Sequence, residues 1–156
     1  MQDEQRTTAR VRAGRLTDKD AIADFQLRLA AETEDFQLDK DTVSRGVQAV
    51  FDDPRKGRYW VAELDGRVAG CLLTVPEWSD WRNGTVLWIH SVYVAPECRR
   101  RGVYRALYEH LHRMVEQDDS LKGLRLYVEK SNLPARRTYE ALEMNGEHYQ
   151  TYEWLK

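Results

Sequence analysis

Three consecutive arginines, Arg99, Arg100 and Arg101, stand immediately before Gly102 and the start of a helical pattern. Cationic side chains at a helix N-terminus face the positive end of the helix dipole, which costs about 0.3–1 kcal/mol each at exposed sites. The backbone N–H groups of a strand, glycine turn and helix start are well placed to hold phosphate. The spacing therefore predicts a cradle for a polyphosphate. The competing interpretation is a solvated basic turn.

Apolar patterns on both sides of the arginines predict the elements that position them. The run Val92-Tyr93-Val94 indicates a strand that stops at Pro96, and Leu107 and Leu111 begin a helical stripe that reaches about residue 117. Two earlier strands, at 59–64 and 67–75, and the strand at 85–94 form a meander. Its turns are predicted at Asp65-Gly66 and at Asn83-Gly84, dipeptides that favour tight hairpins.

The remaining pattern completes the order βααβββαβαβ. We expect a strand at 9–14, a helix capped by Thr17 in a capping box, and a helix capped by Asp39 and ended by Pro54 and Gly57. After the central helix come a strand at 123–129, a helix at 132–142 and a last strand at 147–155. The fold class is α+β (mixed α/β), with about four helices around the sheet. The strands at 85–94 and 123–129 should be parallel, because a helix connects them.

Composition limits the class of protein. The chain has 156 residues, 42% of them hydrophobic, and a formal net charge of −2. We expect one domain over residues 1–156, with residues 1–8 disordered. The acidic balance argues against a nucleic-acid partner, and no apolar run is long enough for a membrane span. Two cysteines offer neither a metal site nor a disulfide framework, so a reducing, cytoplasmic location is expected.

The loop and the helix at 132–142 together resemble the GCN5-related N-acetyltransferase (GNAT) family over essentially the whole chain. The family's acetyl-CoA loop reads Arg or Gln, two residues, Gly, one residue, and Gly or Ala; here it is Arg99-Arg100-Arg101-Gly102-Val103-Tyr104. The second signature is Asn132, Ala135 and Tyr139-Glu140. Tyr104 departs from the pattern, and we expect its side chain to turn toward the core. Glu143 replaces a frequent Gly, and Asn145-Gly146 is expected to supply the left-handed helix cap.

The resemblance implies that the loop and the strand before it bind acetyl-CoA. The backbone near Val94 would pair with the pantetheine arm and polarise the thioester carbonyl, and the arginine side chains are candidates for the phosphates. Asn132 is a candidate contact to the arm, or a helix N-cap, and both can hold together. The implied cofactor-binding residues are Val92, Tyr93, Val94, Arg99, Arg100, Arg101, Gly102, Val103, Tyr104, Arg105, Asn132 and Tyr139.

Proton transfer needs an acid and a base. By resemblance, Tyr139 is the candidate general acid toward the coenzyme A sulfur, and a phenol of pKa about 10 is protonated at neutral pH. His90 is a candidate base because its ordinary pKa of about 6.5 suits the task. Glu77, Glu32 and Glu34 are further candidates, and the last two lie in the segment that lines the acceptor site in the family. Each alone is otherwise a structural or solvated residue.

Trp78, Trp81 and Trp88 fall close together around one predicted turn, and the chain has five tryptophans in all. With Glu77, they suggest an aromatic, partly acidic acceptor pocket for a cationic amine. A homodimer contact is the rival interpretation, since tryptophan is enriched at interfaces.

The sequence thus predicts an acetyl-CoA-dependent N-acetyltransferase that moves an acetyl group directly to a primary amine in a ternary complex. The alternative is a catalytically silent acyl-CoA-binding sensor or scaffold module. The acceptor stays open between a small molecule and a peptidyl amine. Cys98 lies beside the phosphate loop, so an acetyl-cysteine intermediate is not expected.

Overall fold

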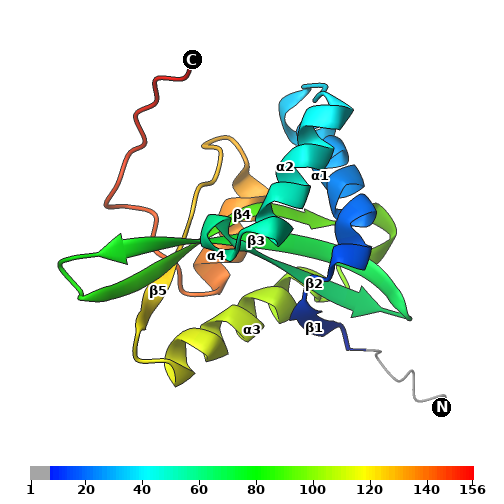
Figure 1. Ribbon diagram of the computed structural model, residues 1–156. Helices are drawn as coiled ribbons and strands as arrows, with labels where there is room; N and C mark the ends of the chain where they lie inside the picture. Colours follow the sequence, from blue (N-terminus) through cyan, green and yellow to red (C-terminus); the bar gives the residue numbers. More distant parts are fainter. Residues whose placement is uncertain (1–7) are drawn as a thin grey trace, which may run out of the picture. The chain divides into compact units, whose positions relative to one another are not determined.

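A computed structural model describes residues 8–156, which divide between Leu126 and Tyr127 into two compact units that we treat separately (Figure 1). The disorder predicted for residues 1–8 falls almost wholly on residues 1–7, which lie outside the described part. In residues 8–156, no helix combines the length and the apolar character needed to cross a bilayer.

The first unit is built on one five-stranded sheet in the order β1-β2-β3-β4-β5. Its strands are β1 (Arg10–Ala13), β2 (Arg58–Leu64), β3 (Arg67–Ser79), β4 (Gly84–Val94) and β5 (Leu121–Leu126). Neighbours are antiparallel except β4 and β5, which are parallel, as the crossover helix predicts. The mixed α/β fold class is therefore confirmed.

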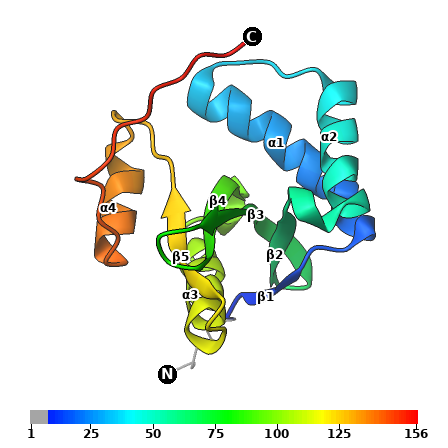
Figure 2. The same cartoon turned by 60° about the vertical axis from the view of Figure 1, so that its left-hand side comes forward.

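Three helices cover the two faces of this sheet. Helices α1 (Lys19–Glu34) and α2 (Lys40–Asp52) lie on one face and α3 (Val103–Gln117) lies on the other (Figures 1 and 2). Tilted aromatic pairs mark the two sides: Phe25 packs against Tyr93 with ring centroids 5.1 Å apart, and Trp60 packs against His110 with centroids 4.9 Å apart. Fully buried side chains from both layers form the core, namely Ile22, Val61, Cys71, Leu72, Val103, Leu107 and Leu111.

Local signals set two of the boundaries as predicted. Asp65 and Gly66 both have positive φ, 53° and 75°, which is the backbone that the β2–β3 hairpin turn requires. Asp39 caps α2, and its carboxylate accepts a hydrogen bond from the Thr42 N–H at 2.8 Å.

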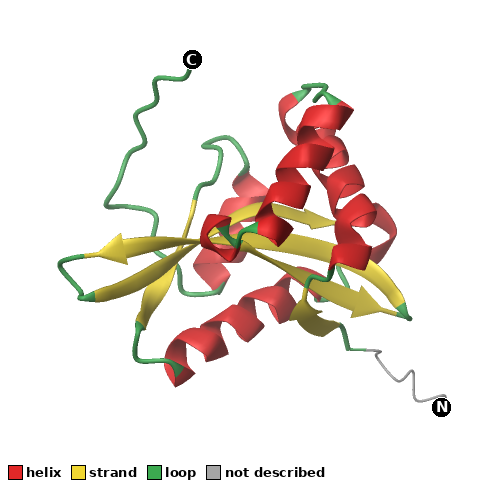
Figure 3. Ribbon diagram, viewed as in Figure 1, coloured by secondary structure: helices red, strands yellow, loops and turns green. Residues whose placement is uncertain are grey.

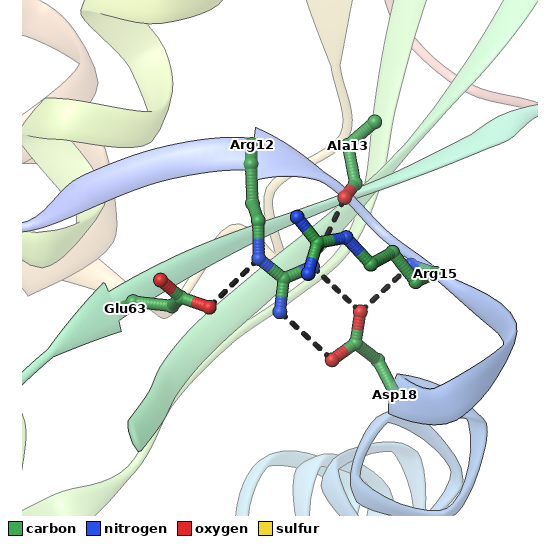
Figure 4. Close-up of polar contacts among 5 residues, drawn as sticks. All are labelled: Arg12, Ala13, Arg15, Asp18 and Glu63. Atoms are coloured by element: carbon green, nitrogen blue, oxygen red, sulfur yellow. Dashed lines mark hydrogen bonds and ion pairs between the residues drawn. The ribbon is translucent and has the colours of Figure 1, made fainter. Parts of the chain in front are cut away.

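The start of α1 differs from the prediction. Thr17 does not cap the helix; it lies in a single 3-10 turn, Leu16–Asp18. Asp18 instead takes the structural role, because its carboxylate accepts the Arg15 N–H at 2.7 Å and two bonds from the Arg12 guanidinium at 2.7 and 3.0 Å (Figure 4). Arg12 also donates to Glu63 on β2 at 2.7 Å. This network fastens the edge strand β1 to the helix layer.

Strand β4 contains a bulge that the alternation of its side chains does not reveal. Cys71 faces Tyr93 and Leu73 faces His90, so Leu72 alone lies opposite both Ser91 and Val92. Ser91 has a φ of 54°, a left-handed conformation typical of such a bulge. Because one residue is extra, His90 and Tyr93 point to the same face although they are three positions apart.

Strand β5 is also shorter at its end than the predicted 123–129. It begins at Leu121 and pairs with β4 only as far as Ile89 with Leu126. The bulge two residues after Ile89 bends β4, so the parallel ladder cannot continue there.

The second unit contains α4 (Leu133–Ala141) and a chain without regular structure after it (Figure 3). Asn132 caps α4 through a bond from the Ala135 N–H at 3.2 Å. The helix ends in a Schellman motif, with Met144 N–H bonded to Tyr139 O and Glu143 N–H to Glu140 O, both at 3.0 Å. Glu143 itself is left-handed, φ 64°, so the predicted Asn145-Gly146 cap is wrong.

The predicted strand at 147–155 is wrong. Residues 147–155 form no strand, and their large side chains are exposed: Tyr149, Tyr152, Trp154 and Leu155. Alternating aromatic residues predict a strand only where a neighbour supplies its hydrogen bonds.

Candidate active site

The basic loop joins the end of β4 to the start of α3. A 3-10 turn at Pro96–Cys98 leads into Arg99, and both Arg100 and Gly102 are left-handed, with φ of 61° and 75°. Gly102 is the N-cap of α3 and makes no side-chain cap. A Cβ placed on Gly102 would meet nothing within 4 Å, so the space above this helix start is open. First-turn N–H groups have no acceptor within their own helix, and this geometry suits an anion.

The arginine side chains divide between carboxylates and the surface. Arg101 donates to Asp65 in the β2–β3 turn at 3.0 Å, and Arg105 donates to Glu109 one turn along α3 at 2.9 Å. Arg99 turns back toward β4, where its Nε donates to the Val94 carbonyl at 3.0 Å. Arg100 is exposed. The loop therefore offers backbone and the Arg100 side chain toward an anion, whereas Arg99 is directed elsewhere.

Glu32, in the last turn of α1, is the partner of Arg99. Its carboxylate accepts a bond from Arg99 Nη2 at 2.6 Å and from the Tyr93 hydroxyl at 2.7 Å. The Arg99 guanidinium also lies 5.5 Å from the centre of the Tyr93 ring. The Tyr93 hydroxyl and then Arg99 hold the pKa of Glu32 below its ordinary value. A carboxylate stabilised in this way is a poor general base.

Glu34 is the last residue of α1 and is exposed.

The end of β4 keeps one side without a parallel partner from β5. The β4–β5 register stops at Ile89, whereas Tyr93 and Val94 pair with Cys71 and Gly70 of β3. The Tyr93 side chain is 3% exposed and packs on Phe25. Val92 and Val94 are half-buried.

A second cluster lies on the α1/α2 face of β3, β4 and β5. The indole N–H of Trp88 donates to Glu77, and Arg125 Nη1 donates to the other oxygen of Glu77 at 3.4 Å. Arg125 also lies over Trp88, 5.9 Å from the ring centre. His90 stacks beside Trp88 with ring centroids 6.2 Å apart and is half-buried. Burial holds the pKa of His90 below 6.5, so the imidazole is neutral at pH 7.

The three tryptophans of the predicted pocket do not come together. Glu77 and Trp88 share one face of the hairpin, but Trp78 follows Glu77 directly and so points to the opposite face. Trp81 lies in the turn and is 89% exposed, and Trp78 is 63% exposed. Only Trp88 lies beside Glu77, so the three tryptophans do not form the predicted aromatic, partly acidic pocket together.

Tyr104 lies in the first turn of α3, half-buried. Its ring packs on Tyr108 one turn later, with centroids 6.5 Å apart, and its hydroxyl oxygen is buried. The side chain therefore turns inward, as expected for a bulky residue where the pattern has Gly or Ala.

Tyr139 lies in α4 on the same helical face as Ala135 and Leu142 and is half-buried. It belongs to the second unit with Asn132, whose side-chain amide oxygen already caps that helix.

Comparison with known proteins gives the family. Residues 23–144 match the model of the acetyltransferase (GNAT) family, a span that contains the basic loop, Glu32, Glu77 and α4. The chain belongs to the GNAT family.

Two solved structures share the fold of this GNAT chain, and a further relative matches part of its sequence. A possible acetyltransferase from Clostridium difficile 630 is 42% identical, with a TM-score of 0.89 over 95% of this chain and 97% of that one. A predicted acetyltransferase with acetyl-CoA from Clostridium acetobutylicum shares the fold at 15% identity, with a TM-score of 0.66 over 96% and 95% of the two chains. An uncharacterized N-acetyltransferase of Methanocaldococcus jannaschii is 37% identical over 81 residues, 52% of this chain and 48% of its own length. The match thus spans about half of that relative.

Sequence reasoning missed Arg125 at this GNAT site. Its neighbours Leu124 and Leu126 carry the apolar alternation of β5, so Arg125 necessarily points to the other face. A basic residue between two leucines was the available signal, and its pairing with Trp88 follows only from the β4–β5 register.

Proposed function

We propose that this chain is an acetyl-CoA-dependent N-acetyltransferase that transfers an acetyl group directly to a primary amine. The observation that carries the proposal is the open, left-handed start of α3 at Gly102, next to a β4 end that β5 leaves without a partner. The first feature suits a pyrophosphate, and the second suits an extended amide arm that adds to a sheet edge. Family membership supports the same donor.

The donor would be held mainly by backbone. Gly102 and the first turn of α3 would face the pyrophosphate, and Arg100 would add charge from its exposed position. The backbone of Val92 and Val94 would face the arm. When bound, acetyl-CoA supplies an activated thioester. The N–H near Val94 would polarise the thioester carbonyl as an oxyanion-type donor.

His90 is the base that these contacts favour. Its neutral imidazole can accept the proton that an ammonium substrate must lose before attack. Glu77 is bound by Trp88 and Arg125, and Glu32 by Tyr93 and Arg99, so both carboxylates serve better as fixed charges than as proton acceptors. Tyr139 would protonate the leaving thiolate, a role that its family position supports.

The amine acceptor would approach the face that carries Trp88, Glu77 and His90. Glu77 supplies a negative charge and Trp88 an aromatic ring, which suit an ammonium group, while Arg125 offsets part of that charge. This balance favours an amine that also carries a polar or anionic group over a simple polyamine.

A free-thiol assay tests the proposal. Acetyl-CoA is combined with putrescine, L-phenylalanine, kanamycin or a peptide with a free N-terminus and one lysine, and thiol release is compared with that of acetyl-CoA alone. We expect release to rise with at least one amine and to fall by about a hundredfold in Tyr139→Phe, the typical contribution of a positioned proton donor. Binding of acetyl-CoA without release for any amine would favour the silent binding module instead.

A further inference from the structure

The contact between Glu32 and Arg99 joins two segments that serve different substrates in the proposed reaction. Glu32 lies in the last turn of α1, on the side expected to receive the acceptor, and Arg99 opens the loop expected to receive the donor. The two residues are 67 positions apart in sequence, and their atoms approach to 2.6 Å. A contact at this place can transmit the position of one segment to the other.

The contact reaches the end of β4 through two routes. Arg99 Nε donates to the Val94 carbonyl at 3.0 Å, which fixes the peptide plane that follows Val94. The Tyr93 hydroxyl donates to the second oxygen of Glu32 at 2.7 Å, and the Tyr93 ring lies under the guanidinium. Tyr93 is otherwise buried against Phe25 of α1. Both oxygens of Glu32 are therefore used to hold the end of β4.

The same contacts make the Arg99 side chain a poor candidate for binding a phosphate. Its Nε is directed to Val94, its Nη2 to Glu32, and its charge is balanced by that carboxylate. Arg101 has a comparable partner in Asp65, but this pair reaches a hairpin turn and no residue of β4. Among the loop arginines, Arg99 thus combines a carboxylate of α1 with the backbone of β4.

From these contacts we infer that Glu32 is a positioning residue for acetyl transfer. Through Arg99 and Tyr93 it holds the last turn of α1 against the backbone of Val94, so that the amine and the polarised carbonyl meet in the correct geometry. The inference rests on the proposed function, because it assigns Val94 to the thioester. Glu32 itself moves no proton.

The test compares Glu32→Gln with two matched carboxylate-to-amide variants. Asp65→Asn removes the partner of Arg101 and suits its turn, since Asn-Gly and Asp-Gly both favour this hairpin. Asp24→Asn removes an exposed ion pair with Arg28 on α1 itself. Each protein, as the full chain, is assayed for kcat and for the KM of acetyl-CoA with the four amines named above.

We expect Glu32→Gln to lower kcat by about tenfold, the scale of a slight misplacement of reacting groups, and to leave the KM of acetyl-CoA unchanged or lower. Tyr93→Phe, which keeps the ring but removes the hydroxyl, should also lower kcat. Both control variants should match the wild type. Equal kinetics for Glu32→Gln and Asp65→Asn would overturn the inference, as would a kcat loss accompanied by a raised KM. If the wild-type chain neither binds acetyl-CoA nor releases thiol, the proposed function is overturned as well. That outcome is distinguishable from a failure of the inference about Glu32 alone, in which the wild type remains active.

Discussion

Trp88 on β4 donates its indole N–H to Glu77 on β3, and Arg125 on β5 donates to the other oxygen of the same carboxylate. Three adjacent strands thus meet at one acidic side chain on the α1/α2 face of the sheet. His90, two residues along β4, stacks beside Trp88 on that face. The Glu77 carboxylate is thus held by two donors, whereas the neighbouring His90 imidazole is neutral at pH 7.

Replacing these two residues should therefore have unequal effects. We expect His90→Gln to lower kcat at pH 7 by about a hundredfold, because a positioned base contributes on that scale, and Glu77→Gln to lower it by less than about tenfold. The check is steady-state kinetics of both variants with an active amine. A larger loss for Glu77→Gln would make Glu77 the base.

The pH profile of the wild type also tests the assignment of His90 as the general base. Because burial lowers the pKa of His90, the imidazole stays neutral to a more acidic pH than usual. The acidic limb of kcat/KM should therefore lie below pH 6.5 and disappear in His90→Gln. A limb above pH 6.5 in the wild type, or one that survives the substitution, would contradict this.

The network of Arg12 and Asp18 should make stability depend on pH. Arg12 and the Arg15 N–H lower the pKa of Asp18, whose side chain is only 8% exposed. A lowered pKa means that the contribution is present above the ordinary pKa of 3.8 and is lost as pH falls through the folded-state value. We expect Asp18→Asn to reduce the free energy of unfolding by about 1–3 kcal/mol at pH 7.

Urea denaturation at pH 7 and near pH 3, followed by circular dichroism, measures this difference. It should shrink at the lower pH, because the Asp18 carboxyl of the unfolded wild-type chain then binds a proton while the folded one stays largely ionised. A difference that is the same at both values would exclude the ionised carboxylate as its source.

The end of α4 offers a stabilising change. Glu143 is held at φ 64°, where an L-residue costs about 1–2 kcal/mol and glycine does not. Glu143→Gly should therefore slow amide exchange in α4 and raise its helicity on heating. Glu140→Gly, inside the same helix, is the opposite control and should destabilise α4 by about 1 kcal/mol. Equal effects of the two variants would contradict a Schellman motif at the C-terminus of α4.

Local signals predicted the elements well, but the contacts between distant residues could not be predicted. The Asp65-Gly66 turn, the Asp39 cap and the Asn132 cap depend on residues within a few positions, and each is visible in the sequence. The bulge at Ser91 has no such signal, since serine rarely adopts positive φ without tertiary constraint. It decides that His90 and Tyr93 share a face.

The basic loop before α3 likewise combines a feature that the sequence predicts with a contact that it does not. The turn at Gly102 was predictable from the glycine itself, whereas the partner of Arg99 was not. Glu32 and Glu77 were candidate bases because a carboxylate can accept a proton. Only the hydrogen bonds to their neighbours in the structure show that both serve better as fixed negative charges. The strand at 147–155 failed because a strand needs a partner, which alternation alone cannot supply.

The central claim, that the start of α3 binds the phosphates of acetyl-CoA, is tested by two glycine substitutions. Gly102 and Gly66 share a φ of 75°, and a Cβ on either meets nothing within 4 Å. Alanine should cost each site a similar free energy of unfolding, about 1 kcal/mol. Only Gly102→Ala places a methyl group where the pyrophosphate would approach.

Isothermal titration of the full-length wild type and both variants with acetyl-CoA is the most direct measurement. We predict that the wild type binds, that Gly66→Ala binds equally well, and that Gly102→Ala loses affinity by at least about tenfold, equivalent to ~1.4 kcal/mol. Equal affinity in Gly102→Ala and Gly66→Ala, or no binding by the wild type, would contradict the claim.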